Sequence, residues 1–191
     1  MKESSANARN LHFLYQLGSL RHVQRSWRQY FGTDVATDLE HTLRVAFIGL
    51  MLSKMEGGAN DEIILKMAIV HDLAESLTGD LTPVQKKYVE IDEERAIHDM
   101  FTGTSLEEYI EVLKVYLERD TIEAKIVKDA DRLDVDLEIR ELAARGHDMK
   151  LWEEKRKVIV DEFFTDSARQ LWHSIQESDP ASWRDVIEGL A

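Results

Sequence analysis

The sequence contains no cysteine and only two prolines in 191 residues. Without cysteine the chain can form neither a disulfide nor a Cys-ligated zinc site, so any metal must be bound by histidine and carboxylate side chains. Because proline interrupts the interior of a helix, its scarcity is compatible with long helices. Helical spacing and N-cap signals recur along the chain, and no stretch shows the sustained alternation of a strand. We therefore predict an all-α fold.

Basic residues are also scarce: Lys and Arg total 24 against 37 Asp and Glu, which gives a net charge of −13. This balance speaks against nucleic acid or an anionic membrane as a partner, because neither binds a strongly acidic surface. A small anionic substrate would need a local cation, and a bound metal ion provides one. No apolar run approaches the roughly 18 residues of a membrane span, and residues 1–10 lack the apolar centre of a signal peptide. We expect a soluble, cytoplasmic protein.

The length and composition fit one globular domain. Hydrophobic residues make up 43% of the chain and charged residues 32%, as in folded proteins, and 191 residues suffice for a sizeable core. We predict a single-domain helical bundle over residues 1–191, with a flexible tail at residues 1–6. Capping and periodicity predict helices over approximately residues 8–20, 38–56, 61–78, 83–102, 106–118, 122–145, 149–176 and 182–190. A short turn preceding the main helix of the fourth range is an open alternative.

The stretch of residues 67–80 combines an apolar run with an adjacent histidine and aspartate, His71 and Asp72. On a continuous helix, Glu75 lies four residues from His71 and three from Asp72, so the three side chains share one face. Residues 65–73 are otherwise apolar except for one lysine, which indicates a helix surrounded by protein. A His-Asp pair buried there must be paired or metal-bound. The stretch therefore predicts a metal site.

The motifs of this chain resemble those of the HD superfamily of metal-dependent phosphohydrolases. A histidine early in one helix, a His-Asp pair in the next long helix and a later Lys-x-Ala-Asp-like segment occur at His41, His71-Asp72 and residues 128–131. The resemblance extends to the 5'-deoxynucleotidase (oxetanocin-like) branch through two longer patterns, His71-Asp72-x-x-Glu75-x-x-x-Gly79-Asp80-x-x-Pro83 and Glu40-His41-x-x-x-Val45-Ala46. Together the motifs span roughly residues 11–140, and their order is far more specific than a His-Asp pair alone. The resemblance implies an HD-type helical bundle.

The resemblance also implies one divalent metal ion, with the ligands His41, His71, Asp72 and Asp131. Two imidazoles and two carboxylates form a mixed site that suits Co, Mn, Fe, Ni, Zn or Mg. The fourth ligand is open from the residues alone, since periodicity places Asp134 inside the apolar stripe and Asp131 further round the helix. The segment of residues 128–131 matches the family pattern and favours Asp131, with Asp134 as the alternative.

The family resemblance assigns further roles around this predicted metal. It implies attack of a metal-bound water on the phosphomonoester of a (deoxy)ribonucleoside 5'-monophosphate, giving nucleoside and phosphate. Glu75 is expected to orient or deprotonate the water or to protonate the leaving oxygen, and Asp80 to hold the sugar or assist the leaving 5'-oxygen. Arg25 is expected to clamp the phosphate, and Trp27 to stack on the base or wall the sugar. The family places such an Arg and Trp side by side, whereas here Ser26 intervenes.

Two other classes of function remain open. One is an HD phosphohydrolase that acts on a nucleoside triphosphate, a cyclic dinucleotide or guanosine tetraphosphate; Glu75 and Asp80 favour the monophosphatase instead. The other is a non-catalytic metal- or nucleotide-binding module, against which the complete set of chemically active residues argues. The dimers of the family, and the many aromatic residues that follow residue 152, also lead us to expect a homodimer.

Overall fold

The computed structural model describes residues 2–189 and, for residues 2–6, only the backbone. This part of the chain is helical, and its only β-type pairing is an isolated bridge between Gln24 and Thr37. The α-helices are α1 (Lys2–Ser19), α2 (Trp27–Phe31), α3 (Asp38–Glu56), α4 (Asp61–Val70), α5 (Glu75–Thr78), α6 (Glu93–Phe101), α7 (Tyr109–Glu118), α8 (Ile122–Ala144), α9 (Lys150–Arg156), α10 (Asp166–Glu177) and α11 (Trp183–Glu188). Short 3₁₀ helices are η1 (Leu20–His22), η2 (Gln85–Lys87) and η3 (Lys157–Glu162). The predicted all-α bundle is confirmed.

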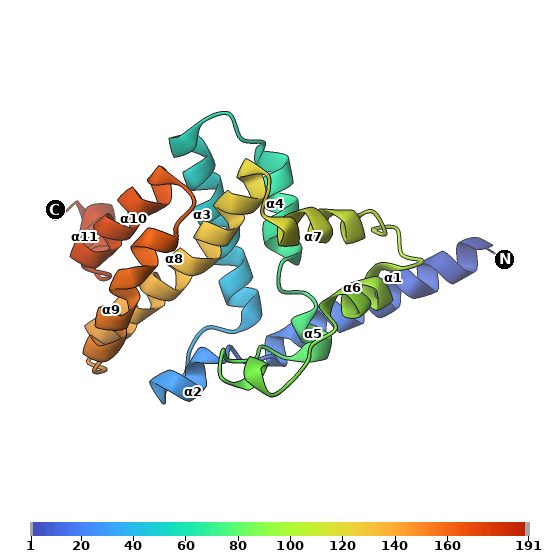
Figure 1. The fold of residues 1–191 in the computed structure, drawn as a ribbon, viewed down its shortest axis with the longest axis horizontal. Coiled ribbons are helices and arrows are strands. Elements are labelled where there is room, and N and C mark those ends of the chain that lie inside the picture. The colour runs from blue at the N-terminus through green and yellow to red at the C-terminus, as the bar shows by residue number, and fades with distance from the viewer. Residues whose placement is uncertain (1, 190–191) are drawn as a thin grey trace.

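Helices α3, α4 and α8 form the centre of the molecule, and α3 packs extensively against both of the others. Figure 1 shows α9 and α10 on one side of this centre and α1, α5 and α6 on the other. Helix α7 packs on α4 and α8 and also contacts α6, so it links the centre to the second group. The central helices therefore carry the core and hold the groups at either side in position.

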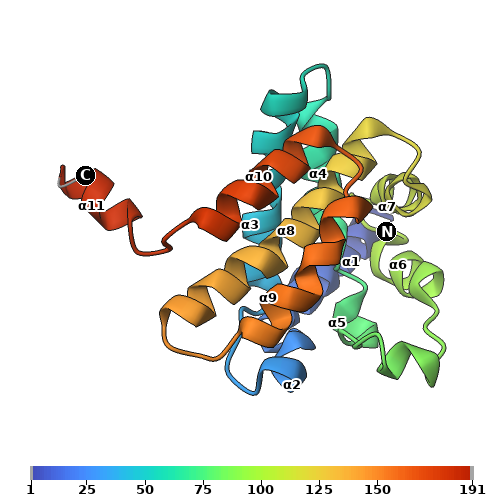
Figure 2. The ribbon, with the colours of Figure 1, turned by 60° about the vertical axis from the view of Figure 1, so that its left-hand side comes forward.

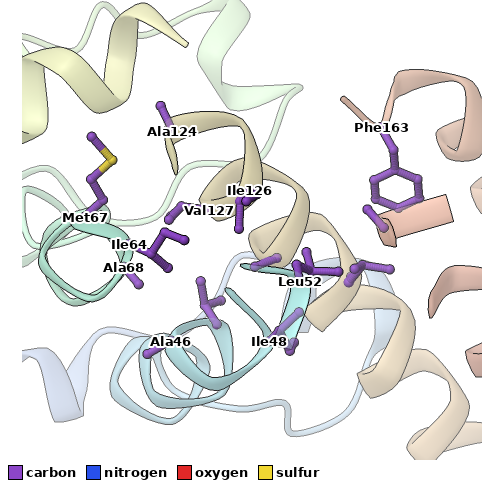
Figure 3. Packing of buried hydrophobic residues seen from close by; sticks show 14 of the residues in the cluster. Ala46, Ile48, Leu52, Ile64, Met67, Ala68, Ala124, Ile126, Val127 and Phe163 are labelled. Atoms are coloured by element: carbon purple, nitrogen blue, oxygen red, sulfur yellow. The ribbon is translucent and has the colours of Figure 1, made fainter. Parts of the chain in front are cut away.

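The main core lies where these three helices meet, as Figure 3 shows for fourteen of its residues. Each helix contributes apolar side chains at helical spacing, which buries one face and leaves the opposite face to solvent. Full burial of one such side chain is worth about 1.5–3 kcal/mol relative to exposure. Fully buried members include Val45 and Leu52 of α3, Ile64 and Ala68 of α4, and Ile126, Val127, Ala130 and Leu133 of α8.

The predicted N-caps of the three central helices are present in the structure. The hydroxyl of Thr37 accepts a hydrogen bond from the N–H of Glu40, whose carboxylate accepts from the N–H of Thr37 in return, a complete capping box. Asn60 caps α4 by accepting from two backbone N–H groups, and Thr121 caps α8. Each cap satisfies backbone donors that the first turn of a helix leaves unpaired. These local signals fix where the site-bearing helices begin.

Two helices begin later in the structure than their capping patterns predict. Thr82 and Gln85 exchange side-chain to backbone hydrogen bonds, but only the 3₁₀ turn η2 follows, and α6 begins at Glu93. The short-turn alternative is thus the one observed. Helix α7 begins at Tyr109, because Thr104 rather than Ser105 accepts the local backbone bond. Short side chains that bond to the backbone stabilise turns as well as helix starts, and here the turn prevails.

The two ends of the chain differ from the sequence expectation. Helix α1 already begins at Lys2, so the backbone of residues 2–6 is helical, although Met1 lies outside the described residues. The flexibility expected for residues 1–6 stays a prediction. At the other end, where the aromatic pattern predicts buried side chains, Phe163 and Trp172 are buried, whereas Phe164 and Trp183 are exposed. Trp183 begins α11, which stands away from the body of the molecule in Figure 2.

Among residues 2–189, no helix combines the length and the apolar character that crossing a bilayer requires.

Candidate metal centre

His41 lies in the first turn of α3 and is completely buried. Its Nδ1 atom is 2.6 Å from the Oδ2 atom of Asp134, which α8 contributes. Its Nε2 atom points the other way and lies 3.4 Å from Asp72 and 3.3 Å from Asp131. One ring nitrogen is therefore held by a carboxylate, while the other faces a group of potential metal ligands.

His71 and Asp72 follow the end of α4, and the predicted continuous helix through residues 71–78 is wrong. Regular α-helix ends at Val70, and the backbone continues with bonds between residues three apart, including Glu75 N–H to Asp72 O at 3.0 Å. Such 3₁₀-type bonds tighten the turn to about three residues, so that residues three apart align. The spacing of His71 and Glu75 therefore does not follow regular α-helical geometry, although both side chains line the same cavity.

The ring of His71 is anchored in the same manner as that of His41. Its Nδ1 atom lies 2.7 Å from the carbonyl oxygen of Ala68, which can only accept, so Nδ1 carries the hydrogen. The Nε2 lone pair then points at the Nε2 atom of His41, 3.3 Å away, and Asp72 Oδ2 lies 3.1 Å from the same nitrogen of His71. A ring with this orientation can offer Nε2 to a metal.

Ligand atoms of His41, His71, Asp72 and Asp131 all lie within 4.8 Å of one another. The structure thus brings together the four side chains that the sequence singled out, from α3, the turn after α4, and α8. Asp131 is held in place by Lys128, whose ammonium group is 2.7 Å from its Oδ2. Asp134 is fully buried behind His41 and reaches that residue only from the Nδ1 side.

The donor set fits a divalent cation on chemical grounds. Two imidazole nitrogens and two carboxylates converge, and the pKa values of Asp72 and Asp131 are held below their usual range, despite burial, by the neighbouring His and Lys side chains. Burial lowers the pKa of His41, but its carboxylate partners outweigh this and hold the pKa well above its usual value. A proton on His41 offsets the negative charge of the surrounding carboxylates, as a bound metal ion would. Metal binding should therefore displace this proton and release it.

Comparison with known proteins identifies the family. A model described as "HD domain" matches residues 17–178. The chain belongs to the HD domain family. It is 32% identical over 176 residues to the 5'-deoxynucleotidase HDDC2 of Dictyostelium discoideum, covering 85% of this chain and 90% of that protein.

A 5'-deoxynucleotidase of Vibrio cholerae is 32% identical over 153 residues, covering 72% of this chain and 78% of the relative. A conserved hypothetical protein of Pyrococcus furiosus has the same fold, with a TM-score of 0.73, 25% identity, and coverage of 88% of this chain and 99% of that one. The resemblance to the HD superfamily and its 5'-deoxynucleotidase branch is confirmed, and the chain is a metal-dependent phosphohydrolase of the HD type.

A second acidic group lies beside the ligands of this HD domain. Carboxylate oxygens of Asp38, Glu75 and Asp80 lie within 4.8 Å of one another. Burial, followed by the charges of Asp72 and Asp80, raises the pKa of Glu75 to about 10, and its buried Oε2 has no hydrogen-bond partner. Burial likewise raises the pKa of Asp38 to about 6. This environment favours the protonated form of the Glu75 carboxyl group.

Arg25 and Asp80 are tied to the same region. Arg25 is buried, and its Nη1 lies 3.5 Å from Asp72 Oδ2. Asp80 accepts a hydrogen bond from the N–H of Ser26 at 2.6 Å and so holds the segment that carries Arg25. An open cavity of about 410 Å³ is lined by Arg25, Ser26, Arg28, Gln29, Asp80 and Gln85.

Trp27 is the one predicted site residue that the structure directs elsewhere. Its ring stacks on Phe31 with centroids 5.6 Å apart and meets Trp152 edge-on at 6.0 Å, within a separate hydrophobic cluster. It lines none of the cavities described around the metal centre. These contacts do not involve the metal centre, and the contact of Trp27 with a base or sugar stays a prediction.

The sequence analysis missed Asp38, Arg44 and Arg119. Asp38 lies on the buried face of α3 with His41 and Val45, at spacings of three and four, so periodicity predicts its burial. Arg44 is hydrogen-bonded to Asp134 and to Glu141. No local sequence pattern predicts these bonds, because both partners are distant along the chain. Arg119 terminates α7 in a left-handed conformation that is normally occupied by glycine.

Proposed function

We propose that this HD domain is a 5'-deoxynucleotidase, a metal-dependent phosphomonoesterase that converts (deoxy)ribonucleoside 5'-monophosphates to nucleoside and phosphate. The observation that carries the proposal is the convergence of four ligand atoms in which both histidines present Nε2. Its substrate class is supported by relatives named 5'-deoxynucleotidase that match most of the chain.

We propose His41, His71, Asp72 and Asp131 as the ligands of one divalent ion. The mixed nitrogen and oxygen donors accept Co, Mn, Fe, Ni, Zn or Mg. When bound, the ion would lower the pKa of a water molecule towards neutral and would neutralise charge on the phosphoryl group. The contacts of Asp134 support Asp131 as the fourth ligand. The carboxylate of Asp134 is already hydrogen-bonded to His41 Nδ1, on the side of the ring away from the cluster, and to Arg44.

The remaining side chains are proposed to handle protons and substrate. Glu75 is partly buried beside Asp72 and its pKa is raised, so its protonated form can donate a proton to the leaving 5'-oxygen, and a nearby cation would lower this pKa towards neutral. Arg25 is proposed to bind the phosphate from the side of the larger cavity. Asp80 holds the segment that carries Arg25 through its hydrogen bond with Ser26. It also lines the cavity of about 410 Å³, where it can bind a hydroxyl group of the sugar.

The function is tested by phosphate release from chelator-treated protein with Co, Mn, Mg or no metal added. Substrates are 5'-deoxynucleoside and 5'-ribonucleoside monophosphates, with triphosphates as controls. Metal-dependent release from the deoxynucleoside monophosphates supports the proposal. Release from triphosphates alone would retain an HD phosphohydrolase but reject the monophosphatase, and inactivity with every metal would favour a binding module.

We also propose that the protein is a homodimer formed through α3. The outer face of this helix carries a row of exposed apolar side chains at intervals of four residues, Leu39, Leu43, Phe47, Met51 and Met55. Residues four apart are neighbours on a helix, so the row forms a continuous apolar ridge that winds part of the way round α3, and a second copy of the same ridge can pack against it in a two-fold contact. The cytoplasmic location stays a prediction from composition.

A further inference from the structure

A small cavity lies beside two of the four proposed ligands, His71 and Asp72. It is lined on one side by His71, Asp72 and Glu75 and has a volume of about 140 Å³. Pockets that hold drug-sized molecules measure about 300–1,000 Å³, so this one is too small for a whole nucleotide. A phosphate group is the part of a nucleotide that matches its size.

The rest of the lining includes three cationic side chains and one further carboxylate, Glu93. Lys86, Arg119 and Lys128 line it together with the ligand residues. Lys128 is already paired with Asp131, so its ammonium group contributes charge close to the ligands. A cavity with cationic walls next to a metal centre suits a dianion, in a chain whose overall charge of −13 would otherwise repel one.

The backbone of Arg119 is unusual. Its φ of 59° makes it the only residue other than glycine with a positive φ among residues 2–189. Arg119 follows the last turn of α7, where a left-handed residue ends many helices and glycine adopts this conformation without strain. The presence of arginine at this position indicates that its side chain serves a purpose, because the backbone alone favours glycine.

The side chain of Arg119 is held in one place. Its Cζ atom lies 3.4 Å from the centre of the Tyr116 ring, a stacked cation–π contact. Tyr116 is buried and meets the ring of His71 edge-on, with centroids 5.9 Å apart. Tyr116 therefore fixes the guanidinium relative to a proposed metal ligand.

One nitrogen of the Arg119 guanidinium has no hydrogen-bond partner within the described structure. This atom, Nη1, is buried. Burying an unpaired charged donor is costly, whereas an anionic acceptor would satisfy it. The planar guanidinium also matches two phosphate oxygens at once.

We propose that Arg119 binds a phosphate group in this cavity, which Lys128 also lines, and that it adds to the phosphate recognition proposed for Arg25. The inference rests on the proposed function, because it places the phosphate of the substrate, or the phosphate released from it, next to the metal ligands. The chemistry recognised is the phosphate dianion in either case. Arg119 thus determines affinity for phosphate, while the metal ligands remain those named above.

The test measures binding of inorganic phosphate to the cobalt-loaded full chain by isothermal titration calorimetry, after free metal has been removed. Arg119→Gln removes the charge, Arg119→Lys keeps the charge but loses the planar fork, and Arg95→Gln removes a charge from an exposed arginine of α6 as the matched control. We expect phosphate affinity to fall roughly 10- to 100-fold in Arg119→Gln and less in Arg119→Lys, and to be unchanged in Arg95→Gln.

Two results would overturn the inference: a wild-type chain that does not bind phosphate, or an Arg119→Gln variant that is folded by circular dichroism and binds it as tightly as wild type. If Arg119 only stabilised Tyr116, the variant would unfold at a lower temperature but bind phosphate normally. Failure of the proposed function is distinguishable. Arg119-dependent phosphate binding without nucleotide hydrolysis rejects the nucleotidase, and hydrolysis with Arg119-independent phosphate binding rejects only this inference.

Discussion

The Nδ1 atom of His41 lies 2.6 Å from Oδ2 of Asp134, whose other carboxylate oxygen is hydrogen-bonded to Arg44. Both His41 and Asp134 are completely buried, so neither can exchange this partner for water. A carboxylate on one nitrogen of a metal-ligating histidine fixes the ring orientation and makes the other nitrogen a better ligand. Asp134 is therefore expected to act on the metal through His41.

Replacement of Asp131 and of Asp134 should have different effects on metal binding. Asp131→Ala removes a proposed ligand and should leave no stoichiometric metal after gel filtration. Asp134→Asn keeps the shape but loses the charge behind His41, and should weaken metal affinity roughly 10- to 100-fold. Equilibrium dialysis with metal analysis measures both. The reverse order, an empty site in Asp134→Asn and a full one in Asp131→Ala, would make Asp134 the ligand.

Asp72→Ala should abolish metal binding and hydrolysis together, because Asp72 Oδ2 lies close to both histidine Nε2 atoms and is proposed to bind the metal. Metal content and phosphate release are measured on the same preparation. The matched control is Asp148→Ala in the other His-Asp pair, where His147 and Asp148 are both exposed. Full activity with stoichiometric metal in Asp72→Ala would reject the proposed site.

Glu75→Gln should leave the metal bound while kcat falls roughly 10²-fold or more, the effect expected when a general acid–base group is lost. Gln has nearly the same shape as the protonated carboxyl group, so a change in packing does not explain such a loss. Steady-state kinetics combined with metal analysis test this expectation. Loss of the metal in this variant would instead make Glu75 a ligand.

The stability of the metal-free protein should depend on pH through Glu75. Its pKa rises from 4.5 to about 10 on folding, so between these pH values the folded protein keeps a proton that the unfolded chain has released. Stability is therefore fully present below pH 4.5 and decreases as the pH rises towards 10. Glu75→Gln removes this penalty, and each kcal/mol relieved should raise Tm by about 2–4 °C.

Thermal unfolding of chelator-treated wild type and Glu75→Gln at pH 5 and pH 8 measures the effect. The variant should lose less stability between the two pH values than wild type does. Equal losses would mean that Glu75 is ionised in the folded protein, and its assignment as a proton donor would then fail.

Phe47→Glu should convert a dimer to a monomer, because a charge at the centre of the exposed apolar row on α3 cannot be buried against a second copy. Light scattering coupled to gel filtration measures the mass in solution. Val158→Glu, at an equally exposed apolar residue of η3, is the control and should leave the mass unchanged. A wild-type mass near 22.1 kDa would contradict the proposed homodimer.

The N-caps of the central helices are features that the local sequence predicts. Thr37, Asn60 and Thr121 each accept backbone hydrogen bonds within their own first turn, so the starts of α3, α4 and α8 follow from a few neighbouring residues. The 3₁₀ turn after Val70 does not follow from neighbours, since an apolar helical pattern continues past it. At this point the chain brings His71 and Asp72 close to His41 of α3 and Asp131 of α8.

The sequence by itself determined the all-α class, the start of the central helices and the metal-ligand candidates, because periodicity and capping depend on residues within one or two turns. Only the tertiary structure decided which aspartate of α8 faces the cluster, since Asp131 and Asp134 differ in the atoms across from them and not in their own chemistry. It also decided that Trp27 packs away from the metal centre and that Arg119 reaches it. Such contacts join residues far apart along the chain, which no local pattern records.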